Sequence, residues 1–298
     1  MTHLESTVDQ GVCESPSVNS EHLGNKLFIG GELGWPSHSD SVVSRFRNGQ
    51  QEQAHDRVAE EAPIALVFNG QPYVVMLATP LDLEEFAVGF SLTEGLVKSP
   101  DEIMSTRLHL RSEGVEVRIR IPEQRFNESV GKARNLTGRT GCGLCGSATL
   151  RQAVRHPDPV GIGCSVAPTD LQTALRQLGD YQTLNRITGA VHAAAWFDLQ
   201  KRSLIVREDV GRHNALDKLI GALVKRRVNV ESGFVVVTSR ASYEMVQKCA
   251  SVGISFMAAI SAPTGLAIRL AEETGLTLVG FARGENCVIY ANPQRWVN

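Results

Sequence analysis

The sequence predicts an α/β protein whose last third forms a parallel β-sheet. Three apolar, largely β-branched runs have the length of strands and are separated by helical patterns: 234–238, 254–260 and 276–281. Strands that alternate with helices pair in parallel through right-handed crossovers. In open sheets of this kind, ligands bind outside the carboxyl ends of the strands. The segments expected at that binding face are 239–240, 261–264 and 283–286.

A smaller α+β part is expected before this core. Four strand-like runs predict two hairpins, 64–68 with 73–77 and 107–110 with 115–121. The first hairpin has Asn69-Gly70 at its turn, which is a strong two-residue turn signal. Between the hairpins, Asp82 and Glu85 have the spacing of a capping box, and Gly95 can end the helix that follows.

The remaining patterns complete the core. Two further strands, 190–197 and 203–207, are expected to pair, and 288–290 is a possible last strand. Helices are expected at 148–154, 169–178 with Gly179 as its end, 214–224, from Ser242 through Cys249, and from Pro263 to Glu273. These patterns give four regions: a poorly ordered leader (1–55), an α+β subdomain (56–130), a mobile glycine-rich loop (131–147) and an α/β core (148–298).

Bulk properties narrow the class of protein. The chain has 298 residues, 42% of them apolar, and a formal net charge of −2, so no global charge favours nucleic acid or an anionic membrane. No apolar run is long enough to span a membrane, and the first ten residues lack the pattern of a secretory signal. We therefore expect a cytoplasmic protein. Its six cysteines are irregularly spaced, which favours reduced thiols over disulfides.

Cys142 and Cys145 form a Cys-x-x-Cys pair inside the glycine-rich segment. Between Ser129 and Pro157 there is no Asp or Glu, whereas five Lys and Arg residues occur there. Cys145 also precedes the expected helix at 148–154, and a helix N-terminus stabilises an anion. Both effects favour a reactive thiolate. A nucleophilic thiol on a mobile loop suits a group carrier that visits a donor and an acceptor.

A single Cys-x-x-Cys pair leaves other chemistries open. A structural zinc site needs four ligands, and the chain has no second pair of this kind. A thioredoxin-like redox pair normally follows an early strand, whereas this pair lies in mid-chain. A zinc deaminase carries Glu two residues after its histidine, but Ala194 stands there after His192. The sequence supports each alternative less well than a reactive thiol. A deaminase would also lack the Glu that shuttles its proton.

Several ordered segments resemble the formate dehydrogenase accessory sulfurtransferases, the FdhD family. The resemblance covers most of residues 60–295 and leaves the leader outside. The segments that carry it are 139–146, 188–194, 207–218, 239–248, and 276–283 together with 292–295, which count as one match. Five ordered matches of this length are highly specific, and the cysteine motif shows no departure from the family pattern.

The resemblance implies a sulfurtransferase with a cytidine deaminase-like α/β core, acting as a homodimer. Such proteins take sulfur from a cysteine desulfurase as a persulfide. They pass it to the molybdenum cofactor, a bis(molybdopterin guanine dinucleotide), before its insertion into the formate dehydrogenase catalytic subunit. The resemblance makes Cys142 the persulfide carrier and Cys145 its helper. It maps the cofactor contact to Phe281, Ala282, Arg283, Gly284, Glu285 and Asn286. A cofactor chaperone without sulfur chemistry is the alternative function.

Two further residues are candidates for cofactor binding. Arg240 follows a strand and can bind phosphate, although an ordinary surface arginine fits equally well. His213 lies one helical turn before Asp217 and could orient the cofactor, but position alone favours a surface pair with Asp209 as a helix cap. His192 is interpreted as a core histidine rather than a ligand. Of the other cysteines, Cys249 is expected to be buried, and no metal site is predicted.

Overall fold

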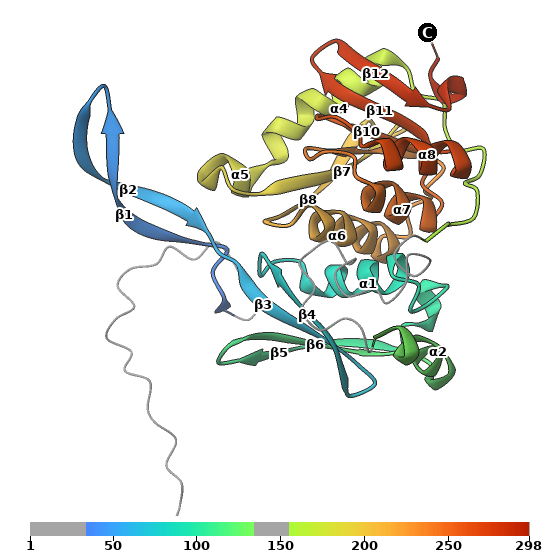
Figure 1. The fold of residues 1–298 in the computed structure, drawn as a ribbon, viewed down its shortest axis with the longest axis horizontal. Coiled ribbons are helices and arrows are strands. Elements are labelled where there is room, and N and C mark those ends of the chain that lie inside the picture. Colours follow the sequence, from blue (N-terminus) through green and yellow to red (C-terminus); the bar gives the residue numbers. More distant parts are fainter. Residues whose placement is uncertain (1–33, 134–154, 298) are drawn as a thin grey trace, which may run out of the picture.

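The computed structural model describes residues 34–133 and 155–297, which form two lobes and a projecting arm (Figure 1). A six-stranded sheet forms the centre of the larger lobe, in the order β12-β11-β10-β9-β7-β8. Its strands are β7 (His192–Asp198), β8 (Ser203–Asp209), β9 (Gly233–Val237), β10 (Phe256–Ala259), β11 (Thr277–Arg283) and β12 (Asn286–Ala291). β9, β10 and β11 pair in parallel, and β7 pairs antiparallel with β8. The predicted α/β fold with a parallel sheet is confirmed.

Helices cover both faces of the six-stranded sheet. They are α6 (Arg212–Lys225), α7 (Tyr243–Ser251) and α8 (Gly265–Thr274) on one face and α4 (Pro168–Tyr181) on the other. Val235 and Val237 pack toward α6, α7 and α8, whereas Phe234 and Val236 pack toward α4. Because both faces of β9 are buried, its sequence is a continuous apolar run rather than an alternating one.

The smaller lobe is a four-stranded sheet in the order β4-β3-β6-β5. Its elements are β3 (Ala62–Phe68), β4 (Gln71–Ala78), α1 (Leu83–Thr93), β5 (Ser105–Arg111), β6 (Gly114–Arg120) and α2 (Glu123–Ala133). Both predicted hairpins are confirmed. Asn69 and Gly70 turn the first hairpin with φ of 50° and 81°, the left-handed region that a two-residue hairpin turn requires.

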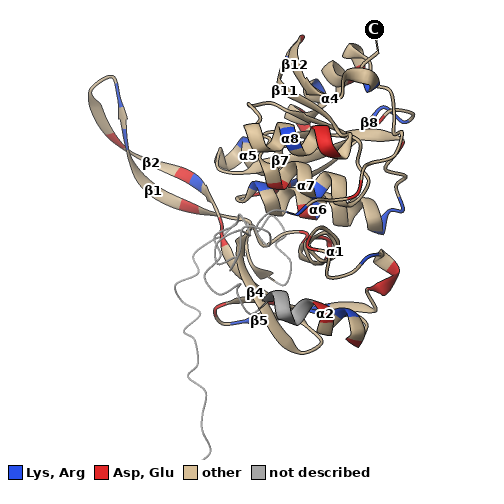
Figure 2. Ribbon diagram, turned by 45° about the vertical axis from the view of Figure 1, so that its right-hand side comes forward, with Lys and Arg blue, Asp and Glu red and all other residues tan. Residues whose placement is uncertain are grey.

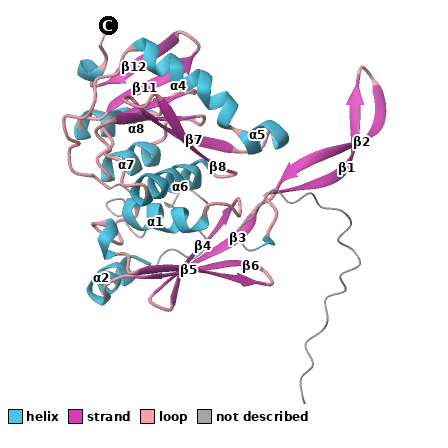
Figure 3. Ribbon diagram, turned by 180° about the vertical axis from the view of Figure 1, so that it is seen from behind, coloured by secondary structure: helices cyan, strands magenta, loops and turns pink. Residues whose placement is uncertain are grey.

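Helix α1 joins the two lobes. A Cβ atom added at Gly89 would lie 1.8 Å from the backbone oxygen of Asp217, and one at Gly221 would lie 1.9 Å from that of Glu85. Only glycine allows α1 and α6 to approach this closely. The opposite face of α1 contributes Phe86 to the core of the smaller lobe. Helix α1 therefore lies between the four-stranded sheet and α6 (Figure 3).

Residues 38–59 form a two-stranded arm that projects from the body (Figure 1). The strands are β1 (His38–Arg47) and β2 (Gln50–Ala59). This arm corrects the expectation of a poorly ordered leader over 1–55, although residues 1–33 lie outside the described part. The arm turns at Asn48 and Gly49, with φ of 51° and 80°, so the same turn signal was present. It was missed because the strands are mostly polar and carry charges of both signs (Figure 2).

Helix ends differ from the predicted ends in several places. Asp82 has a φ of 55° and makes no capping bond, so the predicted capping box is wrong. Ser242 precedes α7 without a side-chain cap. Helix α8 begins at Gly265 rather than at Pro263, and Thr264 caps it. Helix α4 continues through Gly179, where a glycine costs only about 1 kcal/mol. Short elements that were not predicted are α5 (Thr183–Thr188), η3 (Pro100–Glu102) and η4 (Pro293–Arg295).

The region around the cysteine pair is described only at its borders. The mobile loop was expected from residue 131, whereas α2, which was not predicted, ends at Ala133. The helix expected at 148–154 and most of the expected loop lie outside the described residues. Within 34–133 and 155–297, no helix is both long and apolar enough to cross a membrane.

Candidate functional site

The chain segments that follow the three parallel strands are joined to one another at one edge of the sheet. The backbone N–H of Thr264 donates to Ala241 at 3.0 Å, so the segment after β10 is bound to the segment after β9. The N–H of Phe281 donates to Ser261 at 3.2 Å, which adds the end of β11. Helices α7 and α8 start just after these segments. The predicted ligand-binding edge is thus a continuous surface that presents helix N-termini.

The predicted cofactor residues at this edge are exposed, except for Ala282. Phe281 has 43% of its surface exposed, and the exposed Arg283 donates from Nε to the backbone oxygen of Ile260 at 3.0 Å. Arg240 is also exposed. By contrast Ala282 is fully buried, so its side chain offers no ligand contact. The other predicted residues, Gly284, Glu285 and Asn286, are exposed at the turn between β11 and β12.

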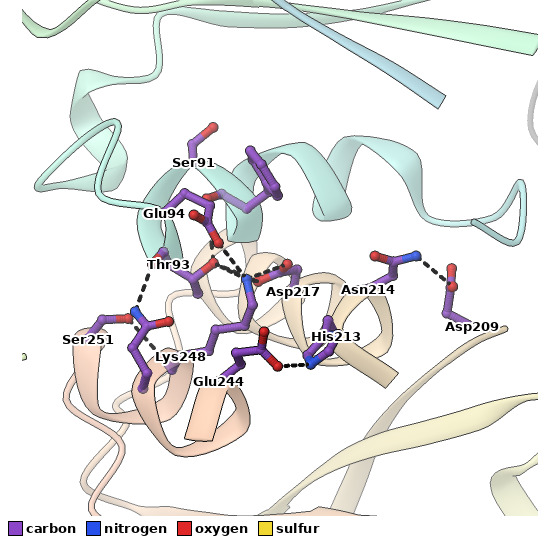
Figure 4. A network of polar contacts seen from close by, with 12 residues as sticks. Ser91, Thr93, Glu94, Asp209, His213, Asn214, Asp217, Glu244, Lys248 and Ser251 are labelled. Carbon is purple, nitrogen blue, oxygen red and sulfur yellow. Dashed lines mark hydrogen bonds and ion pairs between the residues drawn. The ribbon is translucent and has the colours of Figure 1, made fainter. Parts of the chain in front are cut away.

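His213 is buried and does not form a surface pair with Asp217, which corrects the interpretation drawn from their spacing. Its Nε2 lies 2.7 Å from Glu244 Oε2, on the first turn of α7, outside hydrogen-bond alignment. One turn further along, Lys248 Nζ lies 2.9 Å from Asp217 Oδ2. Two side-chain pairs therefore connect α6 and α7 (Figure 4). Sequence reasoning missed Glu244 and Lys248, although both pairs repeat the same four-residue spacing on their helices.

Asp209 is a buried ion-pair partner rather than a helix cap. Its Oδ2 lies 2.6 Å from Lys218 Nζ, with both side chains fully buried, and it also accepts the N–H of Thr79 at 3.0 Å. Its Oδ1 accepts the N–H of Gly211 at 2.7 Å and the side-chain amide of Asn214 at 3.0 Å. These bonds fix the start of α6 against the end of β4, so the edge of the sheet is held by both lobes.

Lys248 is the centre of a charged network between the lobes. Besides Asp217, its ammonium lies 3.2 Å from Glu94 Oε1 and donates to Thr93 Oγ1 at 3.0 Å, at the end of α1. Burial favours the neutral amine, but the carboxylates of Asp217 and Glu94 outweigh it and raise the pKa of Lys248. The side chain therefore stays charged and binds the two lobes together.

Arg155, the first described residue after the cysteine segment, is fixed to this network. The Tyr243 hydroxyl donates to the carbonyl of Arg155 at 2.7 Å and accepts its N–H. The guanidinium of Arg155 lies 2.9 Å from Glu94 Oε2. Burial raises the pKa of Tyr243, which keeps its hydroxyl a donor. The chain therefore returns from the cysteine segment to the first residue of α7, beside the strand-end surface.

Buried polar atoms without a hydrogen-bond partner gather where α6 and α7 begin. The described residues contain six such atoms, and four of them belong to Arg212, His213, Ser242 and Glu244. Buried polar groups are normally satisfied, so this concentration indicates a place built to receive a polar ligand. Arg212 and two helix N-termini favour an anionic group there. Arg212 Nε and the Ser242 hydroxyl are the donors among these atoms, whereas the Glu244 carboxylate oxygen is an acceptor.

The structure describes some of the cysteines and not others. Cys142 and Cys145 lie outside the described residues. Cys249 is buried, as predicted, and burial raises its pKa to about 12. Burial also raises the pKa of Cys164 to about 11, and its Sγ donates to the carbonyl of Gly233 at 3.0 Å. Cys287 is half-buried with a raised pKa. No described thiol therefore has the properties of a nucleophile.

His192 begins β7 at the same edge. It is half-buried, and burial together with the positive charges of Arg212 and His213 lowers its pKa. Its neutral form fits the predicted core role better than a charged one. Among the described residues, no group of three or more His, Cys, Asp or Glu side chains is arranged to hold a metal ion.

The fold and this edge define an α/β protein with polar side chains and helix N-termini at the ends of its parallel strands. The sequence matches the FdhD/NarQ family over residues 59–297. The chain therefore belongs to the FdhD/NarQ family, which confirms the resemblance inferred from the motifs.

Named relatives agree with this assignment. A protein of Cupriavidus necator named sulfur carrier protein FdhD is 50% identical over 260 residues, covering 87% of this chain and 90% of the relative. A protein of Xanthomonas euvesicatoria with the same name is 49% identical, covering 85% and 90%. A crystal structure described as a formate dehydrogenase accessory protein from Desulfotalea psychrophila superposes with a TM-score of 0.69. It covers 88% of this chain and 100% of its own at 24% identity, so it supports the fold.

Proposed function

We propose that this protein is a sulfur carrier that serves the maturation of formate dehydrogenase. Cys142 accepts sulfur from a cysteine desulfurase as a persulfide. The sulfur is then transferred to the molybdenum cofactor, a bis(molybdopterin guanine dinucleotide), before that cofactor enters formate dehydrogenase. The protein acts in the cytoplasm as a homodimer. One observation carries this proposal: the family match spans both cysteines, and the curated relatives are named for carrying sulfur.

The charges around the cysteine pair support the carrier role. The segment from Ser129 to Pro157 holds no carboxylate, and basic residues lower the pKa of nearby thiols. Arg155 fixes the end of that segment beside α7 through Tyr243. A thiol that must exchange sulfur with two partners benefits from both a favourable charge and a fixed attachment to the acceptor surface.

The strand-end surface supports the choice of acceptor. The cofactor is an anionic substrate with pyrophosphate groups and flat rings. Arg240 and Arg283 are exposed at this edge, and the unpartnered atoms of Arg212 and Ser242 lie at the neighbouring helix starts. These donors suit phosphate oxygens.

The chemistry balances in two steps. In the first, the Cys142 thiolate attacks the terminal sulfur of the desulfurase persulfide. A new sulfur–sulfur bond forms on Cys142, and the desulfurase cysteine leaves as a thiolate, with no net oxidation. In the second, the Cys145 thiolate attacks the inner sulfur of Cys142. The terminal sulfur leaves as hydrosulfide toward the acceptor, and the cysteine pair supplies two electrons by becoming a disulfide. A cellular dithiol reductant then restores both thiols.

Mass spectrometry of the intact protein tests the first step. The reduced protein is incubated with a cysteine desulfurase and cysteine, and peptides are mapped for one added sulfur atom. We expect the adduct on Cys142, its loss in Cys142→Ala, and its retention in the matched control Cys287→Ala. An adduct-free Cys142 in folded, reduced protein would exclude sulfur transfer.

A complementation assay tests the role in maturation. Cells that lack the endogenous protein receive either the wild type or Cys142→Ala, and formate dehydrogenase activity is measured. We expect no activity with Cys142→Ala. Full activity with that variant would instead favour a cofactor chaperone that performs no sulfur chemistry.

A further inference from the structure

The four-stranded sheet of the smaller lobe has one open face (Figure 3). Helix α1 packs on the other face, and within 34–133 and 155–297 no helix packs on this one. Because side chains alternate along a strand, the register decides which residues share the open face. The part that we call the outer sheet face consists of Pro63, Ala65, Val75, Leu77, Ser105, Arg107, His109, Arg111, Glu116, Arg118 and Arg120.

One half of the outer sheet face is apolar. Val75 and Leu77 of β4 have 59% and 55% of their surface exposed, and they lie opposite Ala65 and Pro63 of β3. An antiparallel sheet with one solvated face normally carries polar residues on that face. Strand β4 departs from this pattern, since Met76 on its other face is buried in the core. Adjoining apolar side chains at a surface are typical of interaction sites.

The other half of the outer sheet face is basic. Arg107, Arg111, Arg118 and Arg120 are all exposed, and Glu116 is the one carboxylate of the face. Glu116 is already paired, with Arg111 at 2.7 Å and with Arg118 at 2.7 Å. In the described part of the chain, Arg107 and Arg120 have no ion-pair partner. A binding partner would therefore have to supply carboxylates.

Arg107 and Arg118 lie directly opposite each other on neighbouring strands. Like charges in this arrangement destabilise a sheet, whereas a glutamate at position 107 would form a cross-strand ion pair. Folding alone therefore gains nothing from arginine at this position. Arginine is enriched in protein interfaces, and its guanidinium group binds a carboxylate through two parallel hydrogen bonds. The arrangement is that of a surface that meets an acidic partner.

Two other kinds of partner fit the outer sheet face less well. In a two-fold contact between copies of the chain, each face meets itself. The second copy would bring only Glu116, which is already paired, and Glu113 from the turn beside the face. Nucleic acid is favoured by aromatic rings on which bases stack, and the face has no Phe, Tyr or Trp. A protein surface with carboxylates beside an apolar residue is the complementary partner.

The position of the outer sheet face selects between the donor and the acceptor of sulfur. The start of α2 is fixed at the β3–β4 turn, where the side-chain amide of Asn69 donates to Ile121 at 2.9 Å and to Glu123 at 3.2 Å. The described chain thus stops on the smaller lobe and resumes at Arg155, which Tyr243 binds on the larger lobe. Helices α1 and α6 separate the outer sheet face from the strand-end surface, so a partner on one leaves the other uncovered.

We propose that the outer sheet face is the docking surface for the sulfur donor. This inference rests on the proposed function and adds the place at which the cysteine desulfurase binds. The donor presents carboxylates to Arg107 and Arg120, and an apolar side chain beside them covers Val75 and Leu77. The strand-end surface of the larger lobe is left to the acceptor.

Titration calorimetry of the full-length protein with a cysteine desulfurase tests the docking surface. Cysteine is left out, so binding is measured without sulfur transfer. For Arg107→Glu/Arg120→Glu we expect about tenfold weaker binding or more, because carboxylates then face carboxylates. The matched control is Arg176→Glu/Arg186→Glu, which makes the same change of charge at exposed positions of α4 and α5. We expect this control to bind like the wild type.

Two further variants separate docking from folding. Arg107→Glu replaces the like-charge pair with Arg118 by an opposite-charge pair, so its melting temperature should equal or exceed that of the wild type. Its weaker binding would then come from the surface alone. Val75→Thr keeps the shape and the strand propensity of the side chain but makes it polar, and we expect about threefold weaker binding.

Several outcomes would overturn the inference. One is wild-type affinity of the double variant Arg107→Glu/Arg120→Glu for the desulfurase, and another is a wild type that does not bind the desulfurase. A third is a change of oligomeric state in sedimentation, or a loss of binding to an RNA oligonucleotide, in place of the loss of desulfurase binding. The sulfur-carrier proposal is tested separately, because one added sulfur atom on Cys142 shows transfer whichever surface the donor uses.

Discussion

Lys248 Nζ lies 2.9 Å from Asp217 Oδ2, and the two side chains are only 6% and 2% exposed. The same carboxylate accepts a hydrogen bond of 2.7 Å from Thr93 Oγ1, so it joins α6, α7 and α1. A buried charge is tolerated only when it is paired and hydrogen-bonded. The contact between the lobes therefore depends on both Lys248 and Asp217.

Removing one member of the pair should destabilise the protein severely. Asp217→Asn keeps the shape of the side chain but leaves the Lys248 charge buried without its main partner. We expect a loss of about 3–5 kcal/mol in the free energy of unfolding, measured with denaturant. The control is Glu84→Gln at the exposed Lys225–Glu84 pair, with a distance of 2.5 Å, where a loss of about 0–1 kcal/mol is expected. Equal losses at both pairs would contradict the special role of burial.

The contact between α1 and α6 should not tolerate a methyl group. In Gly221→Ala the new Cβ atom would lie 1.9 Å from the backbone oxygen of Glu85, so the helices must separate. We expect a loss of about 1–3 kcal/mol or more, from overpacking. Gly179→Ala in α4 is the control, because no atom lies within 4 Å of its added Cβ. That variant should gain about 0.5–1 kcal/mol from helix propensity. A neutral Gly221→Ala would show that the helices are not packed this tightly.

His192 should make the fold sensitive to acid. Burial and the charges of Arg212 and His213 lower its pKa below the ordinary 6.5, so the folded state binds its proton less readily than the unfolded state. The contribution of His192 to the free energy of unfolding is fully present above pH 6.5. It is lost as the pH falls through the lower pKa of the folded state. His192→Gln should therefore flatten the fall in unfolding free energy below pH 6.5. An unchanged acid slope in denaturant titrations would refute this assignment.

Alkylation should distinguish the described thiols from any reactive cysteine. Because the pKa values of Cys249 and Cys164 are raised to about 12 and 11, their thiolate fractions at pH 8 are about one in a thousand or less. We expect iodoacetamide to leave both unmodified in the native protein and to modify both in urea, as read by peptide mass spectrometry. Rapid native labelling of Cys249 would mean that the core opens far more readily than its packing suggests.

The hairpins and the parallel sheet could be predicted because their signals are local. Asn69 and Gly70 specify a turn by themselves, and β9 is apolar throughout because both of its faces are buried. The arm carried an equally local signal at Asn48 and Gly49, but its strands lack an apolar face that would mark them as part of a core.

The network of charges at the site could not be predicted, because its partners come together only through the fold. His213 and Asp217 read as a surface pair in one helix, yet their partners Glu244 and Lys248 lie on the next helix along the chain. Phe281 likewise has a left-handed backbone conformation, with a φ of 50°, of which the identity of a phenylalanine gives no sign. Family resemblance named Phe281 as a contact, but only the backbone shows how its ring is presented.

The position of α1 has a consequence for any attempt to divide the chain. By sequence the helix belongs to the smaller lobe, but it is a shared layer, with Phe86 in one core and Gly89 against α6. A fragment that ends at Ala133 would expose the glycine face of α1, and a fragment that starts at Arg155 would leave Lys248 and Asp217 without Thr93. Each half therefore lacks contacts that it makes in the intact chain. Two halves expressed together, however, each keep one side of the contact between α1 and α6. A cut between Ala133 and Arg155 is therefore a natural starting point for fragment complementation.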